Sequence, residues 1–317
     1  MKKIIPIIIF FSFIIQCSFA SHIDSIKINA NSEGFLLDGI LLRKSGHKEK
    51  MPVVIFLVGS GGNSSHSTNY KGFAHFFLEK KFLENGFAIV YFDKRGIGKS
   101  QGIWYETTFE QRALDAKNVA MELKNLAFID VNKIFLTGHS QGGWIVQIAL
   151  AQYPELFAGG VSMAGATFGV KKQLINDYQS KYICEKKLDE NNALKKATRK
   201  VNMDLFFVSL FGRKGNWKQL KLIKNFEPES YLQKINKPFL LLFGENDELV
   251  NSRWGIDELK RIFINIPTSF EVYIAKGENH SFKIASKCYN GKLADIHYSE
   301  TTKQKLFSWM NLQANKD

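Results

Sequence analysis

Three segments of the chain contain residue types that together can transfer an acyl group. They are "GHSQGG" with Ser140, "GENDELV" with Asp247 and "GENHSF" with His280. A serine hydroxyl attacks carbonyl carbon at neutral pH only when a general base removes its proton, and the base needs a third group to fix its tautomer. We therefore predict Ser140 as nucleophile, His280 as base and Asp247 as the acid that orients His280.

The pattern G-x-S-x-G occurs twice, at Gly98–Gly102 around Ser100 and at Gly138–Gly142 around Ser140. It exposes a reactive hydroxyl only where a strand turns sharply into a helix. Ser140 meets this demand, because "KIFLT" precedes it and "GGWIVQIALAQY" follows with helical spacing. Ser100 is followed by "QGIWYETTF", which lacks helical periodicity, so Ser140 is the predicted nucleophile.

The segment "FDKRGIGKSQG", residues 92–102, also has partial likeness to two nucleotide-binding patterns. A phosphate-binding loop of the form G-x-x-x-x-G-K-S would need glycine where Asp93 stands. A dinucleotide turn of the form G-x-G-x-x-G would need glycine at Gln101. Both spacings fail, so this segment predicts no nucleotide site.

The base and the acid each have competing candidates. His280 and His297 both follow Ser140, but His280 lies in a polar turn just after an expected strand, whereas His297 lies near the last helix. Asp247 follows the closing glycine of another expected strand by three residues, where a loop can direct a carboxylate towards His280. Glu245 is the next candidate acid, and Glu248 is expected to face solvent.

An acyl-transfer site also needs amide donors for the oxyanion. The backbone amide of Gln141, directly after the nucleophile, is one expected donor. The second is expected from the glycine-rich "LVGSGGNSS", where we choose Ser60 and place Gly61 second. An ordinary flexible turn is the alternative interpretation of this segment.

Short apolar runs separated by helical patterns would position these residues. Continuous apolar character favours parallel strands covered by helices on both faces. Two earlier segments alternate more loosely and predict an antiparallel start of the sheet. The expected buried strands are 52–58, 87–92, 133–138, 159–164, 238–244 and 270–275, and the antiparallel ones are 24–30 and 35–44.

The regular alternation stops between residues 170 and 235. This segment is basic and asparagine-rich, with expected helices at 171–200 and 203–224 and no strand. We predict a helical lid insertion over 170–235, which divides the core into 21–169 and 236–317. Its apolar run "LFFVSLF", residues 205–211, is expected to line an acyl pocket.

With these motifs in place, the chain resembles the α/β-hydrolase superfamily, and within it the serine esterase and acyl-aminopeptidase-like group with a helical lid. The similarity extends over residues 23–312 and includes the nucleophile, acid and histidine segments in that chain order. It implies an eight-stranded, mostly parallel sheet. It also implies that "DKRGIGKS" is a structural loop shaped by Asp93 and Arg95. One departure is Val58-Gly59, where many relatives have His-Gly.

The first twenty residues have two lysines, an apolar run and small residues at Ser18 and Ala20. This pattern predicts a signal peptide over 1–20 and a secreted or periplasmic protein. An uncleaved membrane anchor is the alternative, although the apolar run is shorter than a bilayer requires. Lipidation at Cys17 is less favoured. Cys184 and Cys288 remain either a disulfide or two free thiols.

The sequence as a whole predicts a serine hydrolase that cleaves carboxylic esters, without cofactor or metal. The alternatives are a peptidase for short peptides and a non-catalytic binding protein of the same fold. The net charge of +13 favours weak contact with anionic surfaces or acidic esters, or simply a solvated basic face. The basic segments lack the interleaved aromatics of a nucleic-acid groove. The oligomeric state is left open.

Overall fold

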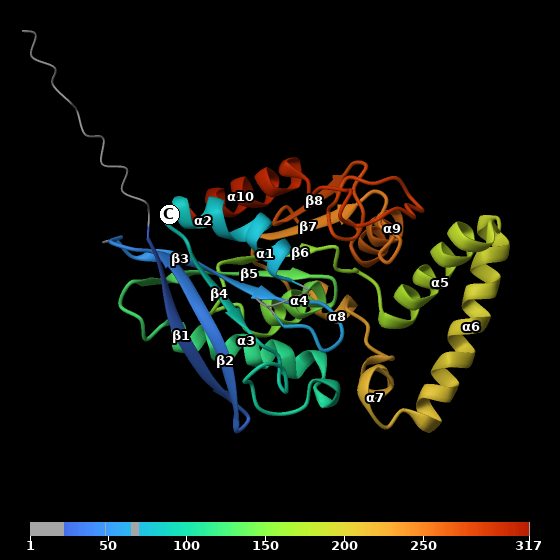
Figure 1. Cartoon of the computed structure of the whole chain (residues 1–317), viewed down its shortest axis with the longest axis horizontal. Helices are drawn as coiled ribbons and strands as arrows, with labels where there is room; N and C mark the ends of the chain where they lie inside the picture. The colour runs from blue at the N-terminus through green and yellow to red at the C-terminus, as the bar shows by residue number, and fades with distance from the viewer. Residues whose placement is uncertain (1–21, 48, 65–69, 317) are drawn as a thin grey trace, which may run out of the picture.

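A single eight-stranded sheet organises the chain (Figure 1). The computed structural model describes residues 22–47, 49–64 and 70–316. The strand order is β1-β2-β4-β3-β5-β6-β7-β8; β2 pairs antiparallel with β1 and β4, and the other pairs are parallel. The predicted signal peptide, residues 1–20, lies outside the described residues.

The strands form where the sequence is apolar and rich in β-branched or aromatic residues. In β3, β4, β6 and β7 nearly every side chain is buried, as expected for strands covered on both faces. The bounds are β1 Ile23–Ser32, β2 Phe35–Lys44, β3 Met51–Leu57, β4 Ala88–Phe92, β5 Ile129–His139, β6 Gly159–Met163, β7 Phe239–Gly244 and β8 Phe270–Ala275. The fold predicted from the sequence is confirmed.

Helices cover both faces of the sheet and form two apolar cores with it. Side chains of α3, α4, α8 and α9 belong to one core, and those of α1, η1, α2 and α10 to the other. The bounds are α1 Lys71–Ala74, η1 His75–Glu79, α2 Lys80–Glu84, η2 Trp104–Glu106, α3 Phe109–Leu123, α4 Gln141–Gln152, α9 Ser252–Ile262 and α10 Glu300–Ala314.

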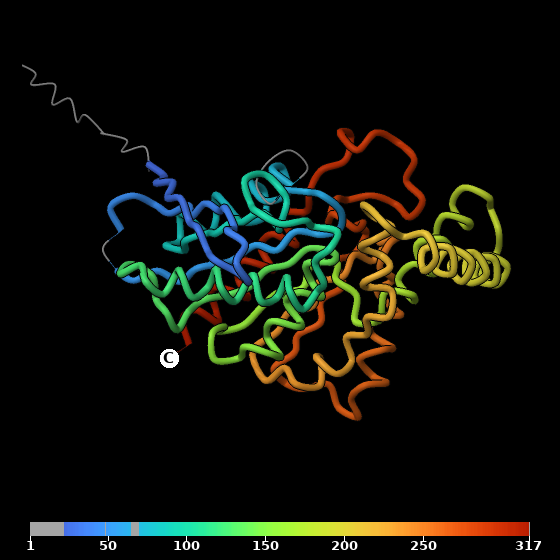
Figure 2. Tube along the Cα trace, turned by 90° about the horizontal axis from the view of Figure 1, so that it is seen from below, coloured from blue at the N-terminus to red at the C-terminus, as the bar shows by residue number. Residues whose placement is uncertain are grey.

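Four helices lie between β6 and β7: α5 Val170–Lys186, α6 Glu190–Phe211, α7 Gly215–Ile223 and α8 Glu229–Leu232. The pair α5 and α6 projects beyond the core (Figures 1 and 2). The expected helix bounds were wrong in this segment. Lys187 adopts a left-handed conformation that ends α5, and the Asp189 side chain accepts the Asn192 amide at the start of α6. The break expected between 200 and 203 is absent from α6.

The loop that follows β4 is held by buried charges. Arg95 donates to both carboxylate oxygens of Asp115 and to Glu33. Such multiple charge-assisted hydrogen bonds fix both partners in one geometry. Arg95 therefore has the structural role that the resemblance implied.

Within residues 22–47, 49–64 and 70–316, none of the helices combines the length and the apolarity that a bilayer span needs.

Candidate active site

Ser140 occupies the sharp turn between β5 and α4. Its backbone has φ 56° and ψ −121°, a left-handed conformation that is strained for a residue with a side chain. The strand ends at His139 and the helix begins at Gln141, so the Ser140 hydroxyl is held above the carboxyl edge of the sheet. This is the strand–turn–helix context that the pattern around Ser140 predicted.

Glycines make this turn possible because the backbones around it nearly touch. A methyl group at Gly138 would collide with the carbonyl of Gly142, and one at Gly142 would collide with the carbonyl of Leu57. Packing therefore restricts Gly138 and Gly142 to glycine. A larger residue at either position would displace Ser140.

Asp247 and His280 lie together at the same edge. Asp247 Oδ2 accepts a hydrogen bond from His280 Nδ1 at 2.8 Å, and Asp247 Oδ1 accepts the amides of Leu249 and Val250, each at 2.8 Å. The Asp247 side chain is fully buried. Its carboxylate is thus held by three donors, one of which is the imidazole that it orients.

Ser140, Gln141 and Ser60 line one pocket. The Ser140 hydroxyl has no hydrogen-bond partner in the part of the chain that the structure describes. Catalytic hydrogen bonds are often long without substrate and tighten when substrate binds. Gly61 is not among the described lining residues, and its φ of 72° matches a tight turn.

Two buried cations hold the loop around Ser60, and sequence reasoning missed both. Lys94 donates to the carbonyls of Gly59 and Gly61, and Arg112 donates to the carbonyl of Val58. Burial lowers the pKa of Arg112 to about 10 and that of Lys94 well below its usual value. These hydrogen bonds hold the backbone carbonyls of the loop and so fix the position of the loop relative to Ser140.

A chain of hydrogen bonds connects this loop to the histidine loop through His139. The Gly59 amide donates to the Tyr70 hydroxyl at 3.0 Å, and that hydroxyl is 3.0 Å from His139 Nδ1. His139 Nε2 is 2.9 Å from the carbonyl oxygen of His280. Tyr70 therefore donates to Nδ1, and His139 carries its proton on Nε2.

This network needs His139 in its neutral form. Burial, together with the nearby charge of His280, lowers the pKa of His139 to about 3. A protonated ring would have two donors, one of which would face the donating hydroxyl of Tyr70. In the folded protein His139 is therefore expected to be neutral above about pH 3.

The shift in pKa predicts a pH-dependent stability. Between pH 3 and pH 6.5 the unfolded chain binds a proton at His139 that the folded chain does not, so the free energy of unfolding rises with pH in this window. The slope from this group is about 1.4 kcal/mol per pH unit in the middle of the window. Urea unfolding at several pH values should give a shallower dependence for His139→Gln than for the wild type. Equal slopes would contradict this assignment.

Ser100 has a structural role in the loop after β4. Its hydroxyl donates to the Asp93 carbonyl at 2.8 Å and accepts the Asp38 amide at 2.9 Å. Ser100 is buried and is not among the described residues that line the Ser140 pocket.

The competing acids and the competing base have other partners. Glu245 accepts the Gly277 amide at 2.8 Å, and Glu248 accepts the Cys288 amide at 2.7 Å. His297 is exposed, and its backbone carbonyl accepts the Ile284 amide. Their side chains do not reach the hydrogen bond between Asp247 and His280.

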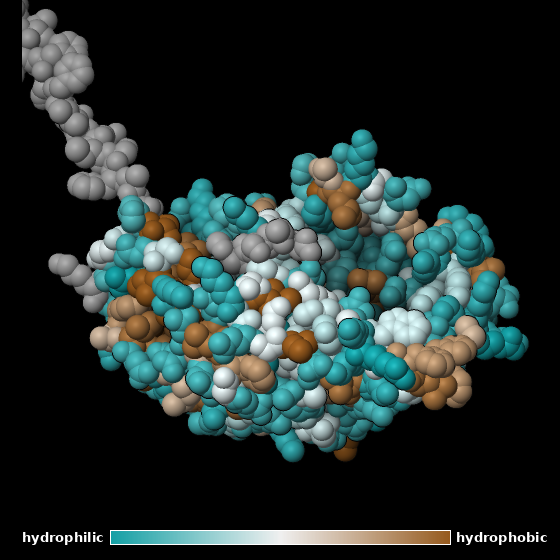
Figure 3. Space-filling model, turned by 60° about the horizontal axis from the view of Figure 1, so that its bottom comes forward, coloured by the Kyte–Doolittle hydropathy of each residue, from teal (hydrophilic) through white to brown (hydrophobic). Residues whose placement is uncertain are grey.

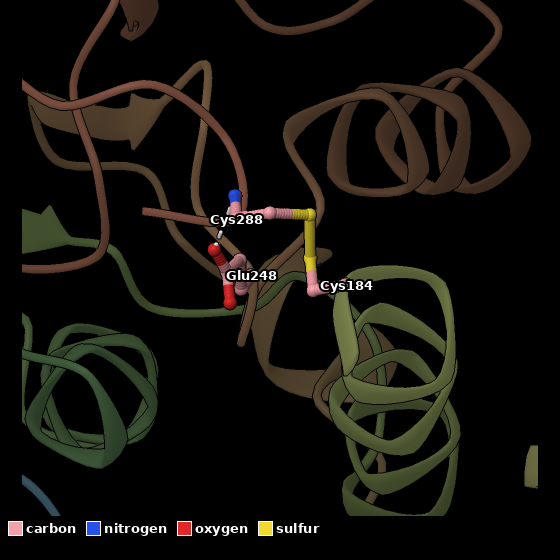
Figure 4. Close-up of a disulfide and its surroundings, with 3 residues drawn as sticks. All are labelled: Cys184, Glu248 and Cys288. Carbon is pink, nitrogen blue, oxygen red and sulfur yellow. Dashed lines mark hydrogen bonds between the residues drawn. A yellow bond between two sulfur atoms is a disulfide. The ribbon is translucent and has the colours of Figure 1, made fainter. Parts of the chain in front are cut away.

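The two cysteines left open by the sequence form a disulfide (Figure 4). It links Cys184 of α5 to Cys288 in the segment after β8, the segment that also carries His280. Glu248 lies beside the disulfide and completes a group with metal-site spacing, but disulfide sulfurs lack the thiolate charge that binds metals. The disulfide and the α5 contacts with residues 248–249 hold α5 against the core.

Helix α5 supplies one wall of the pocket, through Gln173, Leu174 and Asp177. The run 205–211 does not line this pocket, contrary to expectation; Phe206, Phe207, Leu210 and Phe211 are exposed instead. They lie on α6, which packs behind α5.

Asp177 is the acidic residue of this wall. Its carboxylate has no hydrogen bond or ion pair within the described part of the chain. Burial raises its pKa, Lys181 and His280 lower it, and Glu248 and Asp247 raise it. Asp177 thus has unused acceptor capacity in a partly desolvated position.

Parts of this chain are similar in sequence to known proteins. Residues 52–203 match the model of the family described as serine aminopeptidase, S33. An uncharacterized hydrolase of Bacillus subtilis, YugF, is 29% identical over 163 residues, which are 45% of this chain and 58% of that protein. Human dipeptidyl peptidase 8 is 28% identical over 144 residues, 43% of this chain and 16% of that protein. The chain thus spans little more than half of one relative and a small part of the other.

The structural likeness extends over nearly the whole chain. Est1E from Butyrivibrio proteoclasticus, solved with ferulic acid bound, superimposes with a TM-score of 0.60 and 20% identity. The alignment covers 91% of this chain and all of that one. At this identity the likeness shows the fold.

Proposed function

We propose, from the α/β-hydrolase fold of this chain, that it is a secreted serine hydrolase that cleaves carboxylic esters. The observation that carries the proposal is the hydrogen bond from His280 Nδ1 to Asp247 Oδ2, at the edge of the sheet where Ser140 occupies its strained turn. A buried acid that holds an imidazole near such a serine is the arrangement that activates a hydroxyl. A solved esterase of Pyrococcus furiosus is among the proteins of similar fold, which agrees with this class.

The reaction has two steps. In the first, Ser140 Oγ attacks the ester carbonyl while His280 Nε2 takes its proton, and the protonated His280 then gives that proton to the leaving alkoxide. In the second, His280 removes a proton from water, which attacks the acyl-serine; the bond from the acyl carbon to Ser140 Oγ then breaks, His280 returns the proton to Oγ, and the acid is released. Asp247 stabilises the imidazolium, and the amides of Gln141 and Ser60 are the proposed donors to the oxyanion.

In this proposal α5 and α6 act as a lid. Helix α5 supplies part of the pocket, and its disulfide to the segment of His280 keeps that wall in place. The described lining residues include no Lys or Arg, which disfavours the acidic esters considered from net charge. The signal-peptide pattern is the support for secretion.

Asp177 favours a second candidate function, hydrolysis of substrates with a free amino group. A partly desolvated carboxylate without a partner is stabilised by a cation, and removing either partner of such a pair is costly. An α-amino ester or an aminoacyl amide would place its ammonium group in this pocket.

A substrate panel tests both functions. We expect neutral 4-nitrophenyl esters to be hydrolysed and an organophosphate to stop the reaction. No hydrolysis of esters or aminoacyl amides, without organophosphate labelling, would contradict a serine hydrolase and favour the binding protein.

The same panel tests Asp177. We expect alanine methyl ester to be preferred to its N-acetyl form, and Asp177→Asn to lower kcat/KM for the amino ester about tenfold. The N-acetyl ester, which has no ammonium group, is the matched control. An equal effect of Asp177→Asn on both esters would mean that Asp177 does not recognise the amino group.

A further inference from the structure

Helix α6 carries a continuous stripe that changes from basic to apolar along its length. Met203, Phe206, Phe207, Leu210 and Phe211 follow the i, i+3, i+4, i+7, i+8 spacing of one helix face. Their exposed fractions lie between 42% and 61%, and Trp217 of α7 is similarly exposed. We call these six residues the apolar tip.

The same face of α6 is cationic one to two turns earlier. Lys195, Lys196, Arg199 and Lys200 stand eight, seven, four and three residues before Met203, which extends the stripe without a break. Lys196 lies over the Tyr182 ring and Lys200 pairs with Asp204, whereas Lys195 and Arg199 have no ion pair within the described part of the chain.

The stripe is not needed to hold the helix in place. Helix α6 packs through a different face, on which Ala193, Ala197, Val201 and Val208 are buried. Figure 3 shows apolar surface beside polar surface at the projecting end of the molecule. A contiguous patch of exposed apolar side chains on a protein surface marks an interaction site.

We propose that this surface docks the protein on an anionic lipid interface, with the apolar tip inserted among the headgroups and the four cations against lipid phosphates. Aromatic residues next to Lys and Arg on one amphipathic helix are the features that bind helices in the plane of such an interface. The net charge of +13 adds attraction at longer range.

A second copy of the chain fits this surface poorly. In a two-fold contact with parallel helices the cations would face cations, and with antiparallel helices they would be buried against phenylalanines. Either arrangement leaves charges unpaired, which is costly. An anionic lipid interface satisfies both halves of the stripe, because the acyl boundary accepts the apolar tip and the phosphates accept the cations.

Docking would bring the lid to the lipid. Helix α5 packs on α6 and supplies Gln173, Leu174 and Asp177 to the pocket wall, so the docked helix would contact the helix that bounds the proposed ester pocket. This consequence rests on the proposed function, whereas docking itself does not.

The test is co-sedimentation of the purified protein with vesicles of phosphatidylcholine, with or without phosphatidylglycerol. We expect binding to the anionic vesicles, weak binding to the neutral ones, and a loss of binding as salt rises. Phe206→Ser/Phe207→Ser/Phe211→Ser should weaken binding more than tenfold. Lys195→Gln/Arg199→Gln should weaken it about fivefold per cation.

Two matched variants control for non-specific effects. Ile264→Ser/Leu312→Ser changes exposed apolar residues elsewhere, and Lys80→Gln/Lys234→Gln changes exposed cations elsewhere. Both should bind vesicles like the wild type. Hydrolysis of a water-soluble ester, or the thermal midpoint if the protein has no esterase activity, should be unchanged in all four variants.

Three results would overturn the proposal. One is equal binding to neutral and anionic vesicles, and another is binding that neither the phenylalanine nor the cation changes affect. The third is self-association that the phenylalanine variant abolishes, without vesicle binding, because it would identify a second copy as the occupant.

Discussion

Ser140→Ala is expected to lower ester hydrolysis by roughly four to six orders of magnitude and to abolish organophosphate labelling. The hydroxyl is the proposed attacking group, and what remains is the contribution of binding and of the oxyanion donors. Replacing the strained Ser140 by alanine keeps a side chain at φ 56°, so the turn itself should persist. Initial rates and labelling at equal protein concentration measure both effects.

Ser100→Ala is the matched control, because Ser100 lies in the other copy of the same pattern. Its hydroxyl makes two backbone hydrogen bonds, so we expect a loss of stability of about 1–3 kcal/mol and activity within a few-fold of wild type. Labelling that persists in Ser140→Ala and disappears in Ser100→Ala would reverse the assignment.

The sheet could be predicted because its signals are local. Strands buried on both faces give continuous apolar runs, and six such runs coincide with β3 to β8. The turn at Ser140 could be predicted equally well, since the strand, the glycines and the helix that define it are adjacent in sequence. Local signals of this kind need no knowledge of distant contacts.

The supporting contacts of the site could not be predicted in the same way. Tyr70 and His139 are 69 residues apart, and Lys94 reaches carbonyls more than 30 residues earlier. A buried lysine that binds carbonyls has no sequence pattern to distinguish it from a solvated one. The disulfide, which spans 104 residues, was left open for the same reason.

The location predicted for the apolar run 205–211 was wrong, although the run was correctly identified as apolar. The run was expected in the pocket because apolar lids usually face substrate, but α6 turns it outward and α5 forms the wall. Helical periodicity identifies a face without identifying what that face contacts. The neighbouring cations on the same stripe favour a lipid interface, and not a pocket, as the partner of this run.

His280→Ala and Asp247→Asn should each lower kcat severely, and together scarcely more than His280→Ala alone. In Asp247→Asn the amide oxygen can still accept from Leu249 and Val250, which leaves the NH₂ group facing His280 Nδ1. Nδ1 must then accept and Nε2 carries the proton, so the imidazole cannot take the proton of Ser140. We expect a loss of about 10⁴-fold from the wrong tautomer alone.

The double variant decides whether the two residues act as one unit. Once His280 is absent, the tautomer that Asp247 selects no longer matters, so the second change has nothing left to remove. Glu245→Gln is the matched control, because that carboxylate accepts the Gly277 amide in the same loop and should affect kcat little. If the losses of kcat in His280→Ala and Asp247→Asn multiply in the double variant, Asp247 acts independently of the imidazole. If Glu245→Gln lowers kcat as much as Asp247→Asn does, the orienting acid is Glu245.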